Sequence, residues 1–176
     1  YFYQGSTQGS LAEAHERMAK AKTDITVGNM QVALLELRNI ADKNQGSDVG
    51  AEALYLLGSA NFLNLNFAEA RTAFEEYVKR YSKPSITNAA ARAGIAACME
   101  NTGEYAPAAA EYLKALDSYP DGPAAQDYAI GALRCYLLAG DRAAASELRE
   151  RITRDHWRTP AVTTADRLFH EIKPAG

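Results

Sequence analysis

Four turn positions at near-constant spacing constrain the fold of this chain more than any other feature. Each lies between two segments with helical periodicity, and successive positions are 37, 38 and 37 residues apart: Gly28, Leu65, Gly103 and Gly140. Apolar residues that recur every three or four positions are typical of amphipathic helices. The sequence therefore predicts an all-α chain of four similar helical hairpins. An ordinary helical bundle is the alternative, but a bundle does not require this constant spacing.

The stretch 51–81 contains one complete hairpin of this kind. Small residues at Gly58 and Ala70 allow the two helix axes to approach closely, because interaxial distance depends on the side chains at the contact. The space beside that contact is expected to be filled by Leu57, Phe67 and Phe74. The third hairpin repeats the pattern with Gly103, Tyr105, Ala108, Tyr112, Ala115 and Pro120. The fourth keeps Tyr136, Gly140 and Ala145 but replaces both aromatic residues with Arg142 and Arg149.

This pattern resembles the tetratricopeptide repeat, which places Leu-Gly in the first helix and an aromatic residue, Ala and a second aromatic residue in the second helix. The resemblance implies an α-α superhelix, a right-handed solenoid of four helix pairs closed by a C-terminal capping helix. Its repeats and cap are predicted at residues 10–46, 47–84, 87–122, 123–156 and 159–173. The first helix is expected to begin at Ser10, with Glu13 completing a capping box. We expect residues 10–176 to form a single domain.

Composition and residue spacing argue against several classes of function. The net charge of −3 does not suggest a nucleic-acid-binding surface, and no apolar run reaches the roughly 18 residues that would span a bilayer. Cys98 and Cys135 are expected to be small buried packing residues, and a disulfide between neighbouring helices is the alternative. The three histidines form no metal-binding pair in sequence. No catalytic residue, metal site or cofactor is predicted, and we expect no enzyme activity.

Residues 1–9 stand apart from the repeats. They are either a tag remnant or a juxtamembrane segment, since Tyr is favoured at membrane interfaces. The ending Ala70-Phe74-Tyr77-Tyr81 is similar to bacterial cell-envelope members of the repeat family, including membrane-anchored ones. This resemblance implies a scaffold in envelope assembly or secretion at the periplasmic face of the inner membrane, with an anchor upstream of residue 1. The alternative is a cytoplasmic adaptor or regulatory co-chaperone without a membrane link.

In such repeats the first helix of each pair lines a concave groove. The resemblance places these residues in a groove that binds a protein or peptide partner: Met18, Lys22, Glu52, Tyr55, Ser59, Phe62, Leu63, Ala97, Glu100, Asn101 and Arg134. Some relatives clamp a terminal carboxylate with Lys and Asn, but here only Lys22 has a suitable side chain. A mostly hydrophobic peptide or helix is therefore the expected partner. The alternative is that Tyr55 and Phe62 pack against neighbouring repeats.

Overall fold

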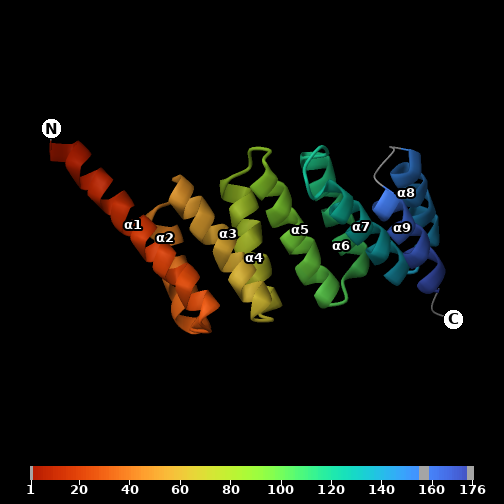
Figure 1. The fold of residues 1–176 in the computed structure, drawn as a ribbon, viewed down its shortest axis with the longest axis horizontal. Helices are drawn as coiled ribbons and strands as arrows, with labels where there is room; N and C mark the ends of the chain where they lie inside the picture. Colours follow the sequence, from red (N-terminus) through yellow and green to blue (C-terminus); the bar gives the residue numbers. More distant parts are fainter. Residues whose placement is uncertain (1, 155–158, 174–176) are drawn as a thin grey trace. The chain divides into compact units, whose positions relative to one another are not determined.

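The computed structural model describes residues 2–154 and 159–173, and side chains from residue 11 to 154 and from 160 to 173. Within these ranges the chain forms nine helices and no strand (Figure 1): α1 Phe2–Thr26, α2 Met30–Lys43, α3 Asp48–Leu63, α4 Phe67–Arg80, α5 Ile86–Asn101, α6 Tyr105–Ser118, α7 Ala125–Leu138, α8 Arg142–Arg154 and α9 Thr159–Glu171. The chain divides into two compact units, residues 1–82 and 83–176. Each unit is described separately below.

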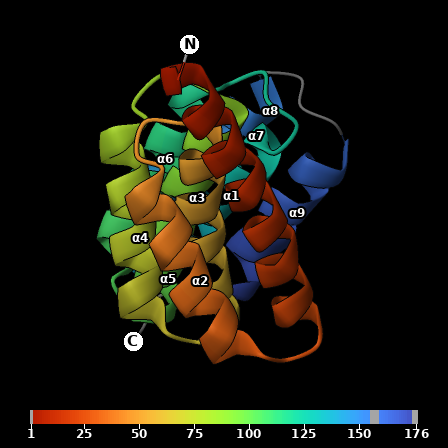
Figure 2. The same cartoon turned by 90° about the vertical axis from the view of Figure 1, so that its left-hand side faces the viewer.

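The first unit consists of two antiparallel hairpins, α1–α2 and α3–α4. Helix α2 also packs on α3, and α1 contacts α3. In Figure 2, α1 and α2 face the viewer, with α3 and α4 behind them. Leu37, Ile40 and Leu54 are fully buried, and burying each such side chain stabilises the fold by about 1.5–3 kcal/mol. A Cβ atom added to Gly58 would lie 2.7 Å from the Phe74 ring, so α3 and α4 approach as closely as the sequence predicted.

The second unit consists of α5–α6, α7–α8 and α9. A close approach in this unit joins successive hairpins, because a Cβ atom added to Gly131 of α7 would lie 2.9 Å from the Tyr112 ring of α6. Leu116, Leu133 and Ile152 are fully buried in this core. Cys98 and Cys135 are both buried and form no disulfide, so the expectation of small packing residues is confirmed.

Two arginines connect α8 to α9, the helix predicted as a cap. The guanidinium carbons of Arg142 and Arg149 lie 4.3 and 4.5 Å from the centre of the Phe169 ring. Arg142 also donates to the carbonyl oxygens of Phe169 and Ile172, at 3.0 and 2.8 Å. These carbonyls lie at the C-terminal end of α9, where cations are favoured. The two arginines that depart from the repeat pattern therefore hold the last helix through its aromatic ring.

The four hairpin turns share one backbone geometry. Gly28, Leu65, Gly103 and Gly140 all adopt a positive φ, between 62° and 88°. In each turn this residue donates its N–H to the carbonyl three residues earlier, and the next residue donates to the carbonyl five residues before it, at 2.8–3.3 Å. This pair of bonds is the Schellman motif that ends helices. The repeat register predicted from sequence is therefore confirmed at the level of backbone hydrogen bonds.

Leu65 is the one described residue other than glycine with a positive φ. A Cβ atom in this left-handed region costs about 1–2 kcal/mol. The Leu65 side chain is 72% exposed, so its removal loses little packing. We expect Leu65→Gly to stabilise the protein by about 1 kcal/mol, since part of the gain is offset by the flexibility of glycine in the unfolded chain. Thermal unfolding would measure it, and Leu63→Gly, at the last residue of α3, should instead destabilise the protein, by up to about 1 kcal/mol.

The start of α1 corrects one prediction. Ser10 does not cap the first helix, because α1 begins at Phe2 and Ser10 lies within it. Residues 2–9 contain no proline, and extending an existing helix adds one hydrogen bond per residue without a new nucleation step. At the other end, residues 155 and 156 of the predicted fourth repeat lie outside the described residues.

Candidate protein-binding surface

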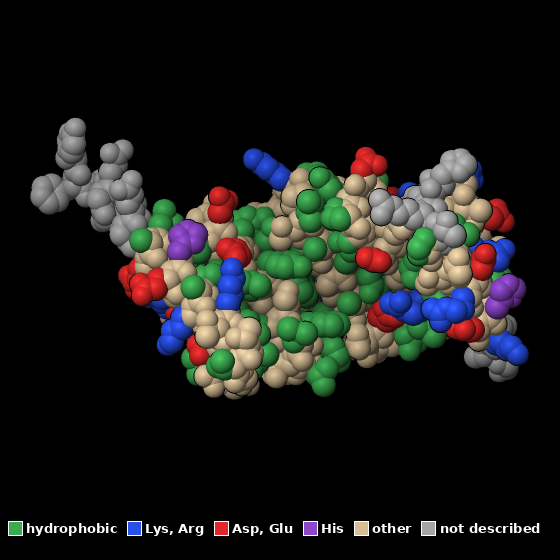
Figure 3. All heavy atoms as spheres, viewed as in Figure 1, with side chains coloured by type: hydrophobic (Ala, Val, Ile, Leu, Met, Phe, Trp, Pro, Cys, Tyr) green, Lys and Arg blue, Asp and Glu red, His purple; other side chains and the backbone are tan. Residues whose placement is uncertain are grey.

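The first helix of each hairpin carries the predicted groove residues, and in the first unit these helices are α1 and α3. Lys22 of α1 and Glu52 of α3 form an exposed ion pair with an Nζ–Oε1 distance of 2.6 Å. The one Lys suited to a carboxylate clamp is therefore engaged by a neighbouring carboxylate. On the face shown in Figure 3, hydrophobic side chains gather over α3 and α4. A partner at this surface would meet an apolar strip beside a neutralised pair of charges.

The aromatic groove residues are partly occupied by contacts within the hairpin. Tyr55 is half-buried, and its ring centre lies 5.8 Å from Phe74 and 5.9 Å from Tyr77. Phe62 is also half-buried and makes an edge contact with Phe67 at 5.4 Å. Aromatic pairs at these distances are favourable. Both rings therefore pack against the second helix of their own hairpin, and these contacts do not test the alternative of packing against neighbouring repeats.

Leu63 is the most exposed apolar member of this set. Its side chain is 68% exposed at the end of α3. Ser59 is half-buried and donates its hydroxyl to the Tyr55 carbonyl at 3.1 Å. Met18 requires a correction, because its side chain is only 2% exposed and belongs to the core. Periodicity alone could not show this, since in α1 the core stripe of Ala14, Met18 and Ala21 lies next to the groove positions.

In the second unit the groove residues lie on α5 and α7. Arg134 of α7 donates two hydrogen bonds to the Glu100 carboxylate of α5, at 2.5 and 2.8 Å. Tyr112 donates its hydroxyl to the same carboxylate at 3.1 Å. Asn101 is exposed and donates to the carbonyl of Ala97 at 2.9 Å. The charged residues predicted for the groove are therefore paired with each other in this unit also.

The Glu100 carboxylate sets the electrostatics of this cluster. Burial raises its pKa, but hydrogen bonds and charge from Arg134, with the hydroxyl of Tyr112, outweigh that effect and hold the pKa below its usual value. Hydrogen bonding to Glu100 raises the pKa of Arg134, so the pair stays ionised at neutral pH. Burial and the nearby Glu100 raise the pKa of the Cys135 thiol to about 12. Cys135 is therefore a protonated thiol at neutral pH and a poor nucleophile.

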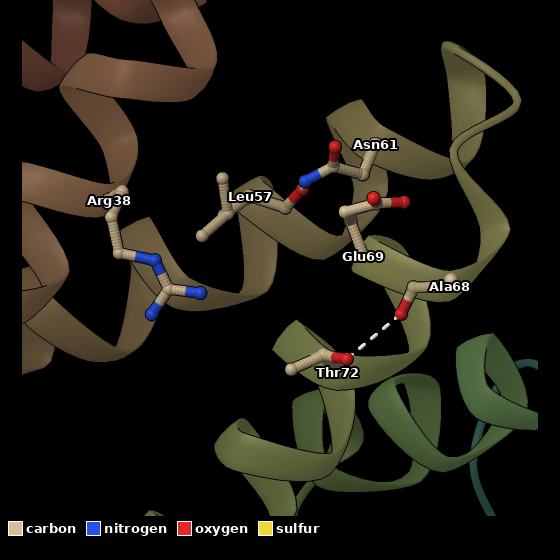
Figure 4. Close-up of a pocket in the computed structure, with 6 residues that line it drawn as sticks. All are labelled: Arg38, Leu57, Asn61, Ala68, Glu69 and Thr72. Carbon is tan, nitrogen blue, oxygen red and sulfur yellow. Dashed lines mark hydrogen bonds between the residues drawn. The ribbon is translucent and has the colours of Figure 1, made fainter.

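Sequence reasoning missed a cleft on the first unit, shown in Figure 4. It has a volume of about 320 Å³ and is lined by Arg38 of α2 together with residues of α3 and α4: Leu57, Asn61, Ala68, Glu69 and Thr72. Asn61 is buried; its Nδ2 donates to the Leu57 carbonyl at 3.0 Å, and its Oδ1 accepts from Asn66 at 3.3 Å. The polar groups at the base of this cleft are thus paired within the chain.

The second unit has a corresponding cleft of about 360 Å³ between α6, α7 and α8. Its lining includes Leu113, Tyr136, Ala144 and Glu147, which lie 75 residues after Arg38, Asn61, Glu69 and Thr72. Equivalent positions therefore line both clefts with different chemistry. This indicates that the clefts follow from the way the repeats pack, and the repeat spacing is the signal that could have found them.

The described residues show neither a metal-binding cluster nor a membrane-spanning helix. They contain no group of three or more His, Cys, Asp or Glu side chains arranged to hold a metal ion. Across the same residues, no helix is both long and apolar enough to cross a bilayer.

The described residues form two-helix repeats that share one turn geometry, with ordered contacts on the first helices. These features define the class of helical-repeat proteins. The tetratricopeptide repeat family model matches residues 18–85 and 64–123. The chain therefore belongs to the tetratricopeptide repeat family, and the match indicates no enzyme family. None of the curated proteins matches the sequence.

Solved structures confirm the fold class, an α-α superhelix of the tetratricopeptide type. A Parabacteroides merdae tetratricopeptide repeat protein matches with a TM-score of 0.72 and 16% identity, over 90% of this chain and 59% of its own length. The MamA protein matches with a TM-score of 0.67 and 18% identity, over 99% and 85%. TPR-like repeats of a kinesin light chain-type protein from Podosopora anserina match with a TM-score of 0.70 and 15% identity, over 89% and 83%. At these identities the likeness concerns the fold alone.

Proposed function

We propose that this protein is a non-enzymatic scaffold that holds a partner polypeptide against the first helices of its repeats. The proposal rests on the charge pairing and the exposure of the predicted groove residues in the first unit. Lys22 and Glu52 neutralise each other across α1 and α3, whereas Leu63 is 68% exposed beside the half-buried ring of Phe62. Apolar groups with a paired polar rim favour a hydrophobic segment over a terminal carboxylate.

We further propose a partner in bacterial envelope assembly or secretion. The support is the resemblance of the repeat ending Ala70-Phe74-Tyr77-Tyr81 to envelope members of the family. Capture from separated fractions of the host tests this part. An envelope protein retained by the purified chain supports it, and a partner found only in the soluble fraction contradicts it. The binding surface itself is tested independently of that outcome.

We expect Leu63→Asp to weaken binding of the captured partner at least tenfold, which corresponds to about 1.4 kcal/mol. The new carboxylate would face an apolar segment and lose hydration without gaining a partner. Isothermal titration with the purified partner measures the effect. Ile86→Asp is the matched control, since Ile86 is also an exposed apolar residue, 52% exposed, but lies outside the predicted groove. Equal binding by Leu63→Asp and the wild-type protein would place the site elsewhere.

A further inference from the structure

One exposed face of the first repeat, on α2, differs in its residues from the equivalent faces of the later repeats. The residues that correspond to Glu69 and Thr72 in the second repeat are Val32 and Leu35, 37 residues earlier. In the third repeat the same positions hold Pro107 and Ala110, and in the fourth Ala144 and Glu147, so the first repeat has the largest apolar side chains there. Val32 and Leu35 are 51% and 74% exposed. Large apolar side chains exposed together on one helix face mark a candidate interaction surface.

The cleft in Figure 4 shows what covers this surface in the second repeat. There, Arg38 of α2 approaches the face formed by Leu57, Asn61, Glu69 and Thr72. The corresponding residues of the first repeat are Lys20, Asp24, Val32 and Leu35. In Figure 2, α1 and α2 are foremost in their unit, and no helix of that unit lies in front of them.

Asp24 supplies an independent observation at this face. Its Oδ1 accepts a hydrogen bond from Asn29 at 3.2 Å, as Oδ1 of Asn61 accepts from Asn66 in the next repeat. Its Oδ2 is buried and has no hydrogen-bond partner among the described residues. A buried carboxylate oxygen without a partner is costly. A cation placed beside this half-buried residue by another molecule would reduce that cost through its charge, without contacting Oδ2.

The four residues are arranged in two pairs on neighbouring helices, so that the face can be complementary to a second copy of itself. Helices α1 and α2 are antiparallel about the turn at Gly28, so Asp24 is level with Val32, and Lys20 is level with Leu35. Lys20 is exposed and lies one turn before Asp24, about 6 Å along the helix. A two-fold axis across the helices would set α1 antiparallel to α1 of a second copy. Lys20 then lies opposite Asp24, and Val32 opposite Leu35, in both directions, as an isologous interface requires.

We propose that this face of α1 and α2 is a homodimer interface, with a second copy of the chain as its occupant. Two ion pairs between Lys20 and Asp24 lie along the paired α1 helices, beside the contacts between Val32 and Leu35 along the paired α2 helices. This surface is distinct from the proposed partner-binding face that includes Leu63, so dimerisation and partner binding can be tested independently.

Sedimentation equilibrium from about 1 to about 300 μM tests the proposal, since a small interface implies micromolar affinity. We expect a reversible dimer, and we expect Val32→Ser/Leu35→Ser to weaken it at least tenfold. Leu63→Ser is the matched control, a leucine of the same unit with a similar exposure of 68%, and should leave dimerisation unchanged. A wild-type monomer at all concentrations, or a dimer unaffected by the double substitution, would overturn the proposal.

Charge exchange tests the pairing itself. Lys20→Glu and Asp24→Lys should each weaken self-association at least tenfold, because like charges then face each other. A one-to-one mixture of the two variants should recover the dimer, since the pairs are again complementary. Circular dichroism checks that each variant is folded; if Asp24→Lys is not, the double variant Lys20→Glu/Asp24→Lys provides the recovery test. Failure of both recovery tests with folded proteins would contradict the antiparallel arrangement.

Discussion

Replacing Gly50 with alanine is expected to destabilise the first unit by about 3 kcal/mol. In an ordinary helix this change stabilises by up to about 1 kcal/mol, so the prediction has the opposite sign. A Cβ atom at this position would lie 2.0 Å from the backbone carbonyl oxygen of Asn44. That oxygen accepts a hydrogen bond from Ser47 Oγ at 2.7 Å, and Ser47 Oγ accepts from the Gly50 N–H at 3.1 Å. The added methyl group therefore forces apart the loop that caps α3.

The estimate combines two known effects. Loss of a Ser cap costs about 1 kcal/mol, and overpacking against a rigid backbone costs about 1–3 kcal/mol. Thermal unfolding should show a decrease in Tm of roughly 6–12 °C for a chain of this size. Ser47→Ala is the matched control, because it removes the cap without the clash and should cost only about 1 kcal/mol. A Tm for Gly50→Ala equal to or above that of the wild-type protein would refute the prediction.

The hairpins could be predicted from the sequence because their signals are local. Gly58 and Phe74 belong to a pattern of a small and an aromatic residue that recurs between repeats. The pair indicates a close contact within one hairpin. Leu65 is informative because it breaks the glycine pattern. Its spacing placed it in the turn, and its backbone has the left-handed φ of 62° that the other three turns reach with glycine. The position of Leu65 in the repeat therefore determines its backbone conformation more than its residue type does, as expected when tertiary packing fixes a turn.

The candidate surface could be predicted only in part, because facing directions depend on contacts between elements distant in sequence. Met18 lies at a groove position by analogy but is buried in the core. In the sequence, Arg142 and Arg149 indicate only that the fourth repeat departs from the pattern. Their contacts with Phe169 show that they hold the last helix. The unpaired oxygen of Asp24 also has no sequence signature, since its burial depends on the folded surroundings.

Replacing Arg134 with methionine is expected to destabilise the second unit by about 2 kcal/mol at neutral pH. Removal of one partner of a buried ion pair costs about 3–5 kcal/mol, whereas an exposed pair contributes about 0–1 kcal/mol. The present pair lies between these limits, because the side chains of Glu100 and Arg134 are 16% and 37% exposed. Methionine retains the apolar stem and removes the charge. Urea unfolding measures the change, with Arg167→Met as a control, since the Arg167–Glu171 pair is fully surface-exposed at 60% and 58%.

The pH dependence separates the ion pair from a packing effect. In the wild-type protein the folded-state pKa of Glu100 is lowered, so its contribution is present above the unfolded value of about 4.3 and is lost as pH falls through the folded pKa. Without Arg134, burial dominates and raises the pKa of Glu100. The variant then bears a penalty at pH 7 that decreases as pH falls through this raised pKa. The stability difference between the two proteins should therefore shrink between about pH 7 and about pH 4. A difference that is constant with pH would mean that Arg134 acts through packing alone.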